Sequence, residues 1–263
     1  MSGPIVSIIV PVLNESGLIR PFLERLRSLA PGAEIIVVDG GSNDGTAELS
    51  SGLADRVLNS SPGRARQMNA GAQVAHADVF WFLHADSLIP PNALEEIATI
   101  LRETSNVGGC FRLKFRGREW IYRVRDSLGN LGVQIFRFAL GDHGIFCRRE
   151  AFIKVGGFPD LPLMEDAEFY RGLRYYGRMH QSDLAIIGNQ RRYEQLGPYR
   201  TTFYYALILG LYVLGVKTSG LVAVYRRLIS NKAPDPLHPH SASLPGSGDS
   251  LSRSTSVPSG LRQ

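Results

Sequence analysis

Residues 35–46 read IIVVDGGSNDGT, four β-branched residues followed by a loop of aspartate, glycine, serine and asparagine. A short, continuous apolar run of this kind predicts a strand buried on both faces, here over 34–38. The two glycines after Asp39 let the backbone approach a ligand closely. The stretch therefore predicts a buried strand that ends in a loop suited to ligand binding.

The same alternation extends in both directions from this stretch. Apolar patterns predict further strands over 7–10, 56–58 and 79–83, and helices over 18–29, 46–54, 64–75 and 92–102. Strands that alternate with helices through short connections form a parallel sheet with helices on both faces. Residues 1–110 therefore predict an α/β fold with a mostly parallel sheet.

The pattern changes after residue 107. Strands are predicted over 109–115, 145–147 and 184–187, and helices over 120–140, 149–155 and 165–176. Gly177 is expected to close the last of these helices. The segment Gly141-Asp142-His143-Gly144 predicts a tight loop.

Two segments follow the predicted sheet. The apolar run 203–216 predicts a helix buried against the fold or a partner, with a membrane-surface helix as the alternative and a spanning helix least favoured. Residues 232–263 are rich in Ser, Pro and Gly, and we expect them to be disordered. We therefore expect one domain over 1–231, with a nucleotide-binding half 1–110, an acceptor half 111–200 and apolar helices over 201–231.

The net charge of +5 is unevenly distributed. Residues 1–110 carry 7 basic and 12 acidic side chains, whereas residues 111–149 carry 9 basic and 3 acidic ones. This asymmetry indicates two functional halves and disfavours a uniformly basic nucleic-acid binder. The two cysteines, Cys110 and Cys147, exclude a disulfide framework and a four-cysteine zinc site, and we expect buried packing thiols.

Polar clusters follow three of the predicted strands where each strand ends, at 14–15, 39–44 and 84–86. The carboxyl ends of parallel strands share one edge of a sheet, which is where ligands bind. The carboxylates Asp39, Asp44 and Asp86 at that edge suit a divalent cation with a sugar or nucleotide. The alternative is that they cap local turns and the helix that follows.

Several other kinds of site are weakly supported or absent. No Walker phosphate loop and no G-x-G-x-x-G motif follows the first predicted strand, so an ordinary dinucleotide fold is unsupported. His84 and His143 are candidate metal ligands, although hydrogen bonding or packing is the preferred role for each. The N-terminus has no basic segment before its first strand, so no signal peptide is expected.

Four segments, in this order, resemble glycosyltransferase family 2, whose members have the GT-A fold. They are VSIIVPVLNE (6–15), IIVVDGGSNDGT (35–46), FWFLHADSLIPP (80–91) and FIKVGGFPDLPLMEDAEFYRGLRYYG (152–177). The resemblance covers about residues 5–200 and implies an α/β fold of GT-A type. Such a fold has a mostly parallel central sheet with helices on both faces, here followed by C-terminal helices.

Shorter motifs resemble a narrower bacterial subgroup of that family. They are GRARQMNAG (63–71), LHAD (83–86), GDHGI (141–145) and LPLMED (161–166). The subgroup is known as the arsenosugar-biosynthesis or radical-SAM/selenodomain-associated glycosyltransferases. Its name rests on genome context, so it implies no particular substrate.

The family resemblance implies transfer of a sugar from a nucleotide-diphosphate sugar to an acceptor hydroxyl, usually with inversion. The acceptor is expected to be a small molecule or lipid-linked, and no nucleic acid is expected. Such a reaction needs a base for the acceptor proton and a Lewis acid for the departing diphosphate. Asp86 matches the last acidic residue of the family's D-x-D element and is expected to hold Mg²⁺ or Mn²⁺. Asp166 matches the catalytic base.

The resemblance also implies substrate-binding residues in the first half of the chain. Pro11, Asn14 and Glu15 match the nucleotide-contacting end of the first strand. Asp39 matches the carboxylate that reads the base or ribose of the donor.

Further substrate-binding candidates lie on predicted helices. Arg66 and Asn69, near Arg64, are expected to contact donor phosphate or ribose, with a solvated basic face as the alternative. Glu165 lies beside the expected base, and the alternative for this acidic pair is ordinary charge at a helix N-terminus. Arg191 and Arg192 are expected to clamp the leaving diphosphate, because arginine forks match phosphate oxygens.

The sequence departs from the family pattern in two places. The D-x-D element reads His84-Ala85-Asp86, so one carboxylate is missing and metal use is in doubt. The Q-x-x-R-W motif of processive polymer synthases is absent, which favours single transfers.

Two other functions remain as alternatives. One is a non-catalytic relative that binds a nucleotide or a partner protein through the basic segment 111–149. The other is a nucleotidyltransferase, which would normally carry a glycine-rich basic loop after the first strand. The segments 203–216 and 225–227 leave peripheral membrane contact open, so the expected location is the cytoplasm or the inner face of its membrane.

Overall fold

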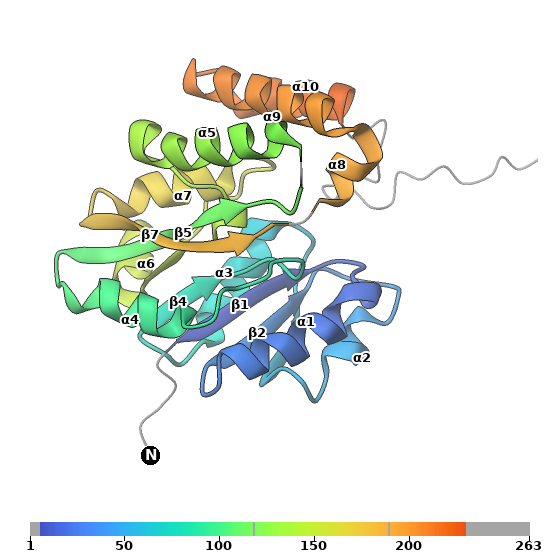
Figure 1. Cartoon of the computed structure of the whole chain (residues 1–263). Helices are drawn as coiled ribbons and strands as arrows, with labels where there is room; N and C mark the ends of the chain where they lie inside the picture. Colours follow the sequence, from blue (N-terminus) through green and yellow to red (C-terminus); the bar gives the residue numbers. More distant parts are fainter. Residues whose placement is uncertain (1–5, 118, 189, 230–263) are drawn as a thin grey trace, which may run out of the picture.

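The computed structural model describes residues 6–117, 119–188 and 190–229, which form a seven-stranded sheet with helices on both faces (Figure 1). The strands lie in the order β3-β2-β1-β4-β6-β5-β7. Strand β6 is antiparallel to its neighbours β4 and β5, and the other pairs are parallel. The predicted mostly parallel α/β fold is confirmed. The predicted disordered tail, 232–263, lies outside the described residues.

The described elements follow the predicted alternation. The strands are β1 (Ser7–Val12), β2 (Glu34–Asp39), β3 (Arg56–Asn59), β4 (Val79–Phe82), β5 (Asn106–Lys114), β6 (Phe146–Arg148) and β7 (Arg178–Ile187). The helices are α1 (Ser16–Leu29), α2 (Thr46–Ser50), α3 (Arg64–Val74), α4 (Ala93–Arg102), α5 (Trp120–Phe136), the short 3-10 helix η1 (Gly141–His143), α6 (Arg149–Val155), α7 (Glu165–Leu173), α8 (Arg191–Leu196), α9 (Pro198–Val213) and α10 (Thr218–Leu228).

The core divides into two layers because successive strand residues point to opposite faces of the sheet. On one face Ile9, in the middle of β1, joins a cluster that includes side chains of α3, α7, α9 and α10. Its neighbour Ile8 joins a cluster on the other face, which includes side chains of α1 and α4. Strands β1 and β2 are buried along their whole length, as their continuous apolar runs predicted.

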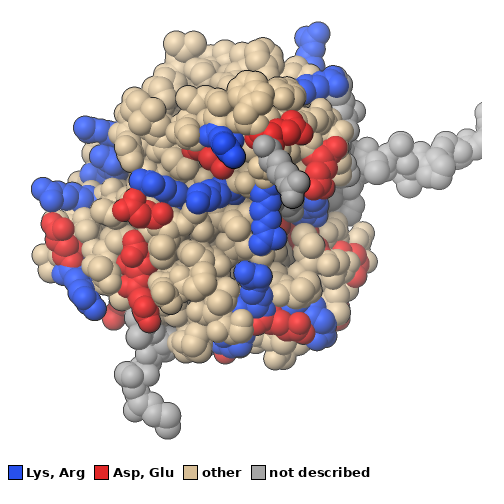
Figure 2. All heavy atoms as spheres, in the orientation of Figure 1, with Lys and Arg blue, Asp and Glu red and all other residues tan. Residues whose placement is uncertain are grey.

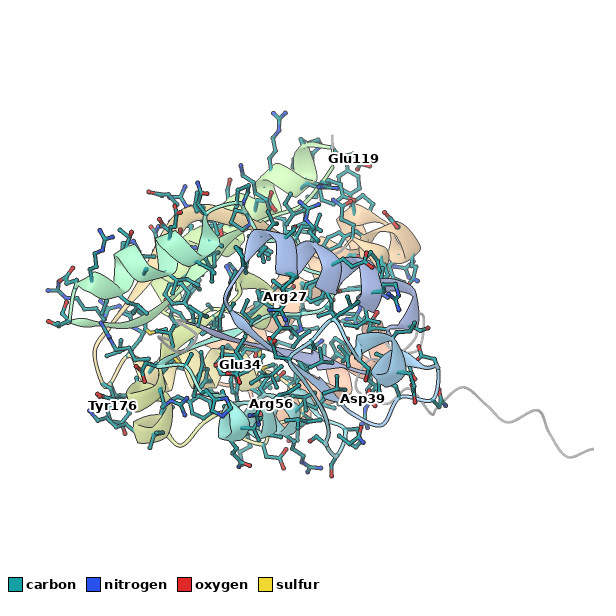
Figure 3. The ribbon with its side chains drawn as sticks, turned by 90° about the horizontal axis from the view of Figure 1, so that it is seen from below. Arg27, Glu34, Asp39, Arg56, Glu119 and Tyr176 are labelled. Carbon is teal, nitrogen blue, oxygen red and sulfur yellow. The ribbon has the colours of Figure 1, made fainter. Side chains whose placement is uncertain are left out.

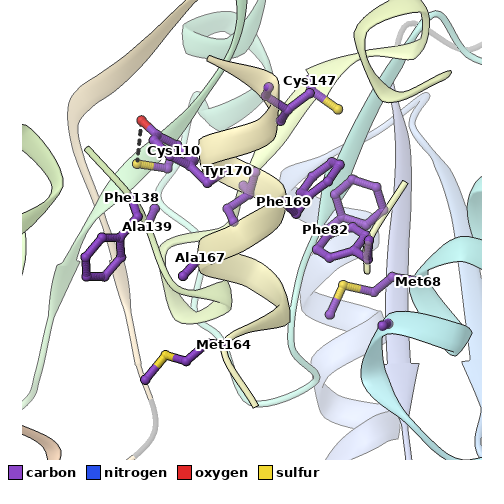
Figure 4. Close-up of a cluster of buried hydrophobic side chains, with 14 of the residues drawn as sticks. Met68, Phe82, Cys110, Phe138, Ala139, Cys147, Met164, Ala167, Phe169 and Tyr170 are labelled. Carbon is purple, nitrogen blue, oxygen red and sulfur yellow. Dashed lines mark hydrogen bonds between the residues drawn. The ribbon is translucent and has the colours of Figure 1, made fainter. Parts of the chain in front are cut away.

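Both cysteines lie in the first of these clusters (Figure 4). The thiol of Cys110 is 4.0 Å from the hydroxyl of Tyr170, a weak hydrogen bond. Burial raises the pKa of the Cys110 thiol to about 12, and that of Cys147 rises for the same reason. Both are therefore inert packing thiols, as predicted.

Gly177 has a different role from the one predicted. Helix α7 ends at Leu173, four residues before the glycine, and Gly177 is not among the described glycines with a left-handed backbone. A Cβ atom at this position would collide with the side chain of Val107. Glycine is therefore required here by the close approach of the loop to the start of β5.

The C-terminal helices pack along one side of the molecule, beside α5 and α7 (Figure 1). Helix α9 buries Thr201 and Ile208 against the fold, while its opposite side is exposed. The prediction of a buried helix over 203–216 is therefore right for one face only. None of the described helices is long and apolar enough to cross a membrane.

Candidate active site at the carboxyl edge of the sheet

The loops that follow β1 and β2 are bound to each other. The Oδ1 atom of Asn14 accepts a hydrogen bond from the Asn43 N–H at 3.1 Å, and the Asn14 N–H donates to Ser42 Oγ at 2.9 Å. Asn14 has a φ of 54°, a left-handed conformation that asparagine tolerates better than most residues. The Glu15 N–H donates to Thr46 Oγ1 at 2.9 Å. The predicted convergence of these two strand ends is confirmed.

The two aspartates of the β2 loop organise the loop itself. Asp39 is buried, and its two oxygens accept hydrogen bonds from the N–H and the hydroxyl of Ser42. Asp44 accepts from the Thr46 N–H at 3.1 Å and the Ser16 N–H at 3.0 Å, which lie at the starts of α2 and α1. Despite some burial, these bonds lower the pKa of Asp44 to about 2. The capping alternative is therefore right for Asp44, whereas contact of Asp39 with a donor stays a prediction.

A buried glutamine joins the ends of β1 and β2. Pro11 lies within β1 opposite Val38. The side-chain amide of Gln67, on α3, donates to the carbonyl oxygens of Val12 and Val38, both at 2.8 Å. Sequence reasoning missed Gln67, whose one signal was its place inside the GRARQMNAG motif.

Arg191, the first residue of α8, connects the ends of β1 and β4. Its Nη2 atom lies 3.0 and 3.2 Å from the two carboxylate oxygens of Glu15 and 3.5 Å from Asp86 Oδ2. The structure thus brings together three predicted site residues from positions 15, 86 and 191 of the chain.

Asp86 is the predicted metal ligand, and its side chain is 26% exposed beside Arg191. No three His, Cys, Asp or Glu side chains gather as a metal site within the part of the chain that the structure describes. Magnesium usually binds through one or two carboxylates and completes its shell with water and substrate phosphate. One partly exposed carboxylate beside an arginine fits that kind of site.

The predicted base, Asp166, lies in the first turn of α7 and is only 5% exposed. Its Oδ2 atom accepts a hydrogen bond from the Gly141 N–H at 3.0 Å. Its Oδ1 atom is buried without a hydrogen-bond partner among the described residues. Burial, reinforced by the neighbouring Glu165, raises the pKa of Asp166 to about 8. A buried carboxylate with one unpaired oxygen and a raised pKa is suited to accept a proton.

Gly141 leaves room for both His84 and Asp166 to pack against its backbone. A Cβ atom on this glycine would collide with His84 Nε2 and lie 2.6 Å from Asp166 Oδ2. His84 Nε2 is also 3.9 Å from Asp142 Oδ1. Burial and the positive charge of Arg64 lower the pKa of His84, so the imidazole is neutral at neutral pH.

Arg64 supplies the positive charge next to His84, Glu165 and Asp166. Its Nη1 atom lies 3.8 Å from Glu165 Oε1. Burial disfavours the charged guanidinium, but Glu165, Asp166 and Asp142 outweigh it and raise the pKa of Arg64. The loop of Gly141 and Asp142 was predicted only as a turn, although its GDHGI motif could have identified it as part of the site. His143 in the same loop is buried, with Nδ1 3.0 Å from the Phe111 oxygen, and burial lowers its pKa to about 4.

Three predicted substrate-binding side chains have their polar atoms occupied elsewhere. Arg66 forms an exposed ion pair with Asp160 at 2.8 Å. Asn69 donates to the Phe158 carbonyl and accepts from its N–H, which holds the loop before α7. Arg192 donates to the hydroxyls of Tyr205 and Tyr225 and so fastens α8 to α9 and α10. Protein atoms hold these three side chains in this structure, and their contact with a substrate stays a prediction.

The family model of glycosyl transferase family 2 matches residues 7–156. Among curated proteins, the undecaprenyl-phosphate 4-deoxy-4-formamido-L-arabinose transferase of Pseudomonas paraeruginosa is 31% identical over 157 residues, which are 55% of this chain and 46% of that protein. The protein of the same name from Aeromonas hydrophila is 29% identical over 142 residues, 49% of this chain and 43% of its own length. The chain thus spans a little under half the length of these relatives.

Solved structures share the fold at low sequence identity. A mannosyltransferase from Pyrobaculum calidifontis, in complex with GDP-mannose and Mn²⁺, aligns with a TM-score of 0.60 at 20% identity over 86% of this chain and 71% of its own. Glucosyl-3-phosphoglycerate synthase from Mycobacterium tuberculosis, with Mn²⁺, UDP and its product, aligns with a TM-score of 0.54 at 19% identity over 82% of this chain and 81% of its own. These likenesses identify the fold as GT-A. Because the family model covers more than half of the 263 residues, the chain belongs to glycosyl transferase family 2.

Proposed function

We propose that this protein transfers a sugar from a nucleotide-diphosphate sugar to the hydroxyl of an acceptor, with inversion at the anomeric carbon. The observation that supports this most is Asp166, a buried carboxylate with one unpaired oxygen and a raised pKa at a helix N-terminus. Transfer to a hydroxyl needs a group that removes a proton as the new bond forms. A single base serves a single displacement, in which the acceptor attacks opposite the leaving diphosphate.

In this proposal Asp166 acts on the acceptor, and Arg191 with the loops after β1 and β2 binds the donor. Asp166 takes the acceptor proton, and the Gly141 N–H holds its other oxygen in place. Arg191 moves between its carboxylate partners, Glu15 and Asp86, and the diphosphate oxygens that arginine binds well. The loops after β1 and β2 bind the nucleoside, with Asn14, Glu15 and Asp39 nearest to it.

Asp86 would hold a divalent cation, Mg²⁺ or Mn²⁺. When bound, such a cation neutralises the charge that develops on the leaving diphosphate. Solved relatives of the fold contain Mn²⁺ beside a nucleotide or nucleotide sugar, which supports this part of the proposal. His84 stands where the first acidic residue of the D-x-D element would be, and it turns toward Gly141 and Asp142.

The acceptor is proposed to be lipid-linked, with a small-molecule acceptor as the alternative. The curated relatives carry names that specify undecaprenyl phosphate, which favours the lipid-linked class. In a polyprenyl phosphate the attacking oxygen would belong to the phosphate instead of a hydroxyl. The same proposal places the protein in the cytoplasm or at the inner face of its membrane. It also includes membership of the narrower bacterial subgroup.

The donor half of the proposal is tested by thermal unfolding with a panel of nucleotide-diphosphate sugars and Mn²⁺. We expect one donor class to raise the Tm, and Asp86→Ala to remove the part of the gain that depends on Mn²⁺. Arg178→Ala is the matched control, because its exposed pair with Glu103 lies at the start of β7, away from the carboxyl edge of the sheet. Donor hydrolysis, followed as release of the nucleoside diphosphate, identifies the base and the sugar.

Two results would contradict the proposal. Absence of any Tm shift across the panel would contradict nucleotide-sugar binding. Donor binding without hydrolysis or transfer to any acceptor would favour the non-catalytic, nucleotide-binding relative instead.

A further inference from the structure

An exposed apolar stripe runs along helix α5. Large apolar side chains recur every three or four residues on its outer side, which is the spacing of a single helix face. They are Trp120, Val124, Leu128, Leu131 and Ile135, with Trp120 and Leu128 each 61% exposed. Isolated exposed apolar residues are ordinary, but a continuous stripe marks an interaction surface.

Helix α9 carries a second stripe beside the first. Its exposed large apolar side chains are Tyr199, Phe203, Leu207 and Val213, followed by Leu214, and Phe203 is 64% exposed. The rings of Trp120 and Tyr199 are 5.9 Å apart, so the two stripes adjoin. The α5–α9 surface is defined here as these two stripes together. Its two helices lie side by side in Figure 1.

A cation-lined cavity borders this surface. The cavity measures about 420 Å³ and lies between α5 and β5. It is lined by Arg112, Lys114, Arg123, Asp126, Ser127, Asn130, Leu131 and Gln134. Leu131 belongs to the apolar stripe as well, so the stripe and the cavity share an edge. The one acidic side chain, Asp126, accepts a hydrogen bond from the Phe115 N–H, which turns it toward the backbone.

The arrangement of charge distinguishes between kinds of partner. Helix α9 contains no acidic residue, and the upper part of the face in Figure 2 is almost free of charged atoms. Lys and Arg side chains cross the same face below it, with some Asp and Glu side chains among them (Figure 2). Apolar side chains bordered by cations, with Trp and Tyr among them, are the pattern of helices that lie in the interface of an anionic bilayer.

We propose that the α5–α9 surface binds the surface of an anionic lipid bilayer, with a lipid phosphate beside Lys114 and Arg123 in the cavity. Arg112 of the same lining already pairs with Asp183 at 2.8 Å. The expected contact through 225–227 stays a prediction: Tyr225 is buried and bonded to Arg192, whereas Arg226 and Arg227 are exposed. This inference does not depend on sugar transfer, but binding to a bilayer would bring the protein to a lipid-linked acceptor. Tyr212 of α9 donates to Glu168 on α7, the helix of Asp166, so docking would hold the site next to the membrane.

The test is flotation of the full chain with phosphatidylcholine vesicles, with and without phosphatidylglycerol, at low and high salt and without any sugar donor. We expect binding that needs phosphatidylglycerol and weakens with salt. Leu128→Glu and Phe203→Glu should each weaken binding by roughly tenfold or more, since each moves a charge into the buried face. The double variant Lys114→Gln/Arg123→Gln should weaken binding by about fivefold per cation and reduce the dependence on phosphatidylglycerol.

Ile153→Glu is the matched control, because Ile153 is 66% exposed on α6, outside the proposed surface. It should bind vesicles like the wild type. All variants replace exposed side chains, and their Tm values report whether the fold is intact. Wild-type protein that fails to float, or glutamate variants that float unchanged, would overturn the proposal. A dimer in light scattering that Leu128→Glu dissociates, without vesicle binding, would assign the surface to a second copy instead.

Discussion

Two buried carboxylates at opposite edges of the sheet have opposite environments. Glu34, at the start of β2, receives hydrogen bonds from the Ser7 hydroxyl and the His76 N–H, lies 2.7 Å from His76 Nδ1 and is 3.7 Å from Arg56 Nε. Figure 3 labels Glu34 next to Arg56 and away from Asp39, at the other end of the strand. Asp166 accepts one hydrogen bond, from the Gly141 N–H, and its second oxygen has no hydrogen-bond partner within the described chain.

The pKa values of the two groups shift in opposite directions. Burial alone would raise the pKa of Glu34, but the bonds from His76 and Ser7 outweigh it and lower the pKa below 4.5. Burial and Glu165 raise the pKa of Asp166 to about 8. A buried charge is normally fully paired, and an unpaired one is costly, so a poorly paired buried carboxylate is a candidate functional group. The difference separates a carboxylate that stabilises the fold from one available for chemistry.

The largest expected effect is on turnover at the unpaired carboxylate. Asp166→Asn keeps the shape and the acceptor for the Gly141 N–H but cannot take a proton. Transfer to a hydroxyl should fall by about 10²–10⁴-fold, while the Tm gain from the donor remains. Wild-type kcat should rise with pH toward a plateau above about 8, where Asp166 is ionised.

The matched control for this substitution is Glu34→Gln, which makes the same acid-to-amide change at the other edge. It should leave kcat near the wild-type value. Full turnover in Asp166→Asn would contradict a role as base. It would favour a phosphate acceptor, which already carries a negative oxygen and needs no deprotonation.

The second-largest expected effect is on the free energy of unfolding, and here the larger loss is expected for the variant at Glu34. Glu34→Gln removes the charge and replaces one of the two acceptor oxygens with an NH2 group, so at least one of the bonds from Ser7 and His76 is lost, and the free energy of unfolding should fall by about 1–3 kcal/mol. Asp166→Asn should cost less, or stabilise the protein, because the environment of Asp166 disfavours its charge and leaves one of its oxygens without a hydrogen bond. Urea unfolding at neutral pH measures both. Equal losses for the two variants would remove the distinction drawn between the sites.

The smallest expected effect is on how the stability contributions of Glu34 and Asp166 change with pH. The stabilisation from Glu34 is present above its unfolded pKa near 4.5 and is lost as the pH falls through its lower folded value. The contribution of Asp166 has the opposite sign, because its stability is complete below 3.8 and is lost as the pH rises to about 8. In urea unfolding across this pH range, the free energy of unfolding of the wild type should fall relative to that of Asp166→Asn as the pH rises. Parallel curves would show that Asp166 titrates normally.

Local patterns were sufficient for most of the fold and for part of the site. The apolar runs of β1 and β2 identified buried strands, because burial on both faces leaves few polar positions. The start of β7 was missed by six residues, since Arg178, His180 and Asp183 give its first half a polar sequence. That half is stabilised by pairing with β5, a contact between distant segments.

The adjacent arginines of α8 show what local patterns could not supply. Successive residues of a helix point about 100° apart. Arg191 therefore reaches Glu15 and Asp86, whereas Arg192 reaches the hydroxyls of Tyr205 and Tyr225. Arg64 and Arg66 differ in the same way, because one faces Glu165 and the other Asp160. Neighbouring positions with the same chemistry thus acquired different roles from the elements packed against them.

Neighbouring residues were enough to predict the alternation of strands and helices, the polar loops at strand ends and the acidic start of α7. Which charges meet and which stay unpaired depended on the packing of the complete fold. This packing placed Gly141 against His84 and Asp166, and it left the outer faces of α5 and α9 uncovered within the described chain. Those outcomes depend on how distant segments pack, because burial and pairing are properties of the assembled fold.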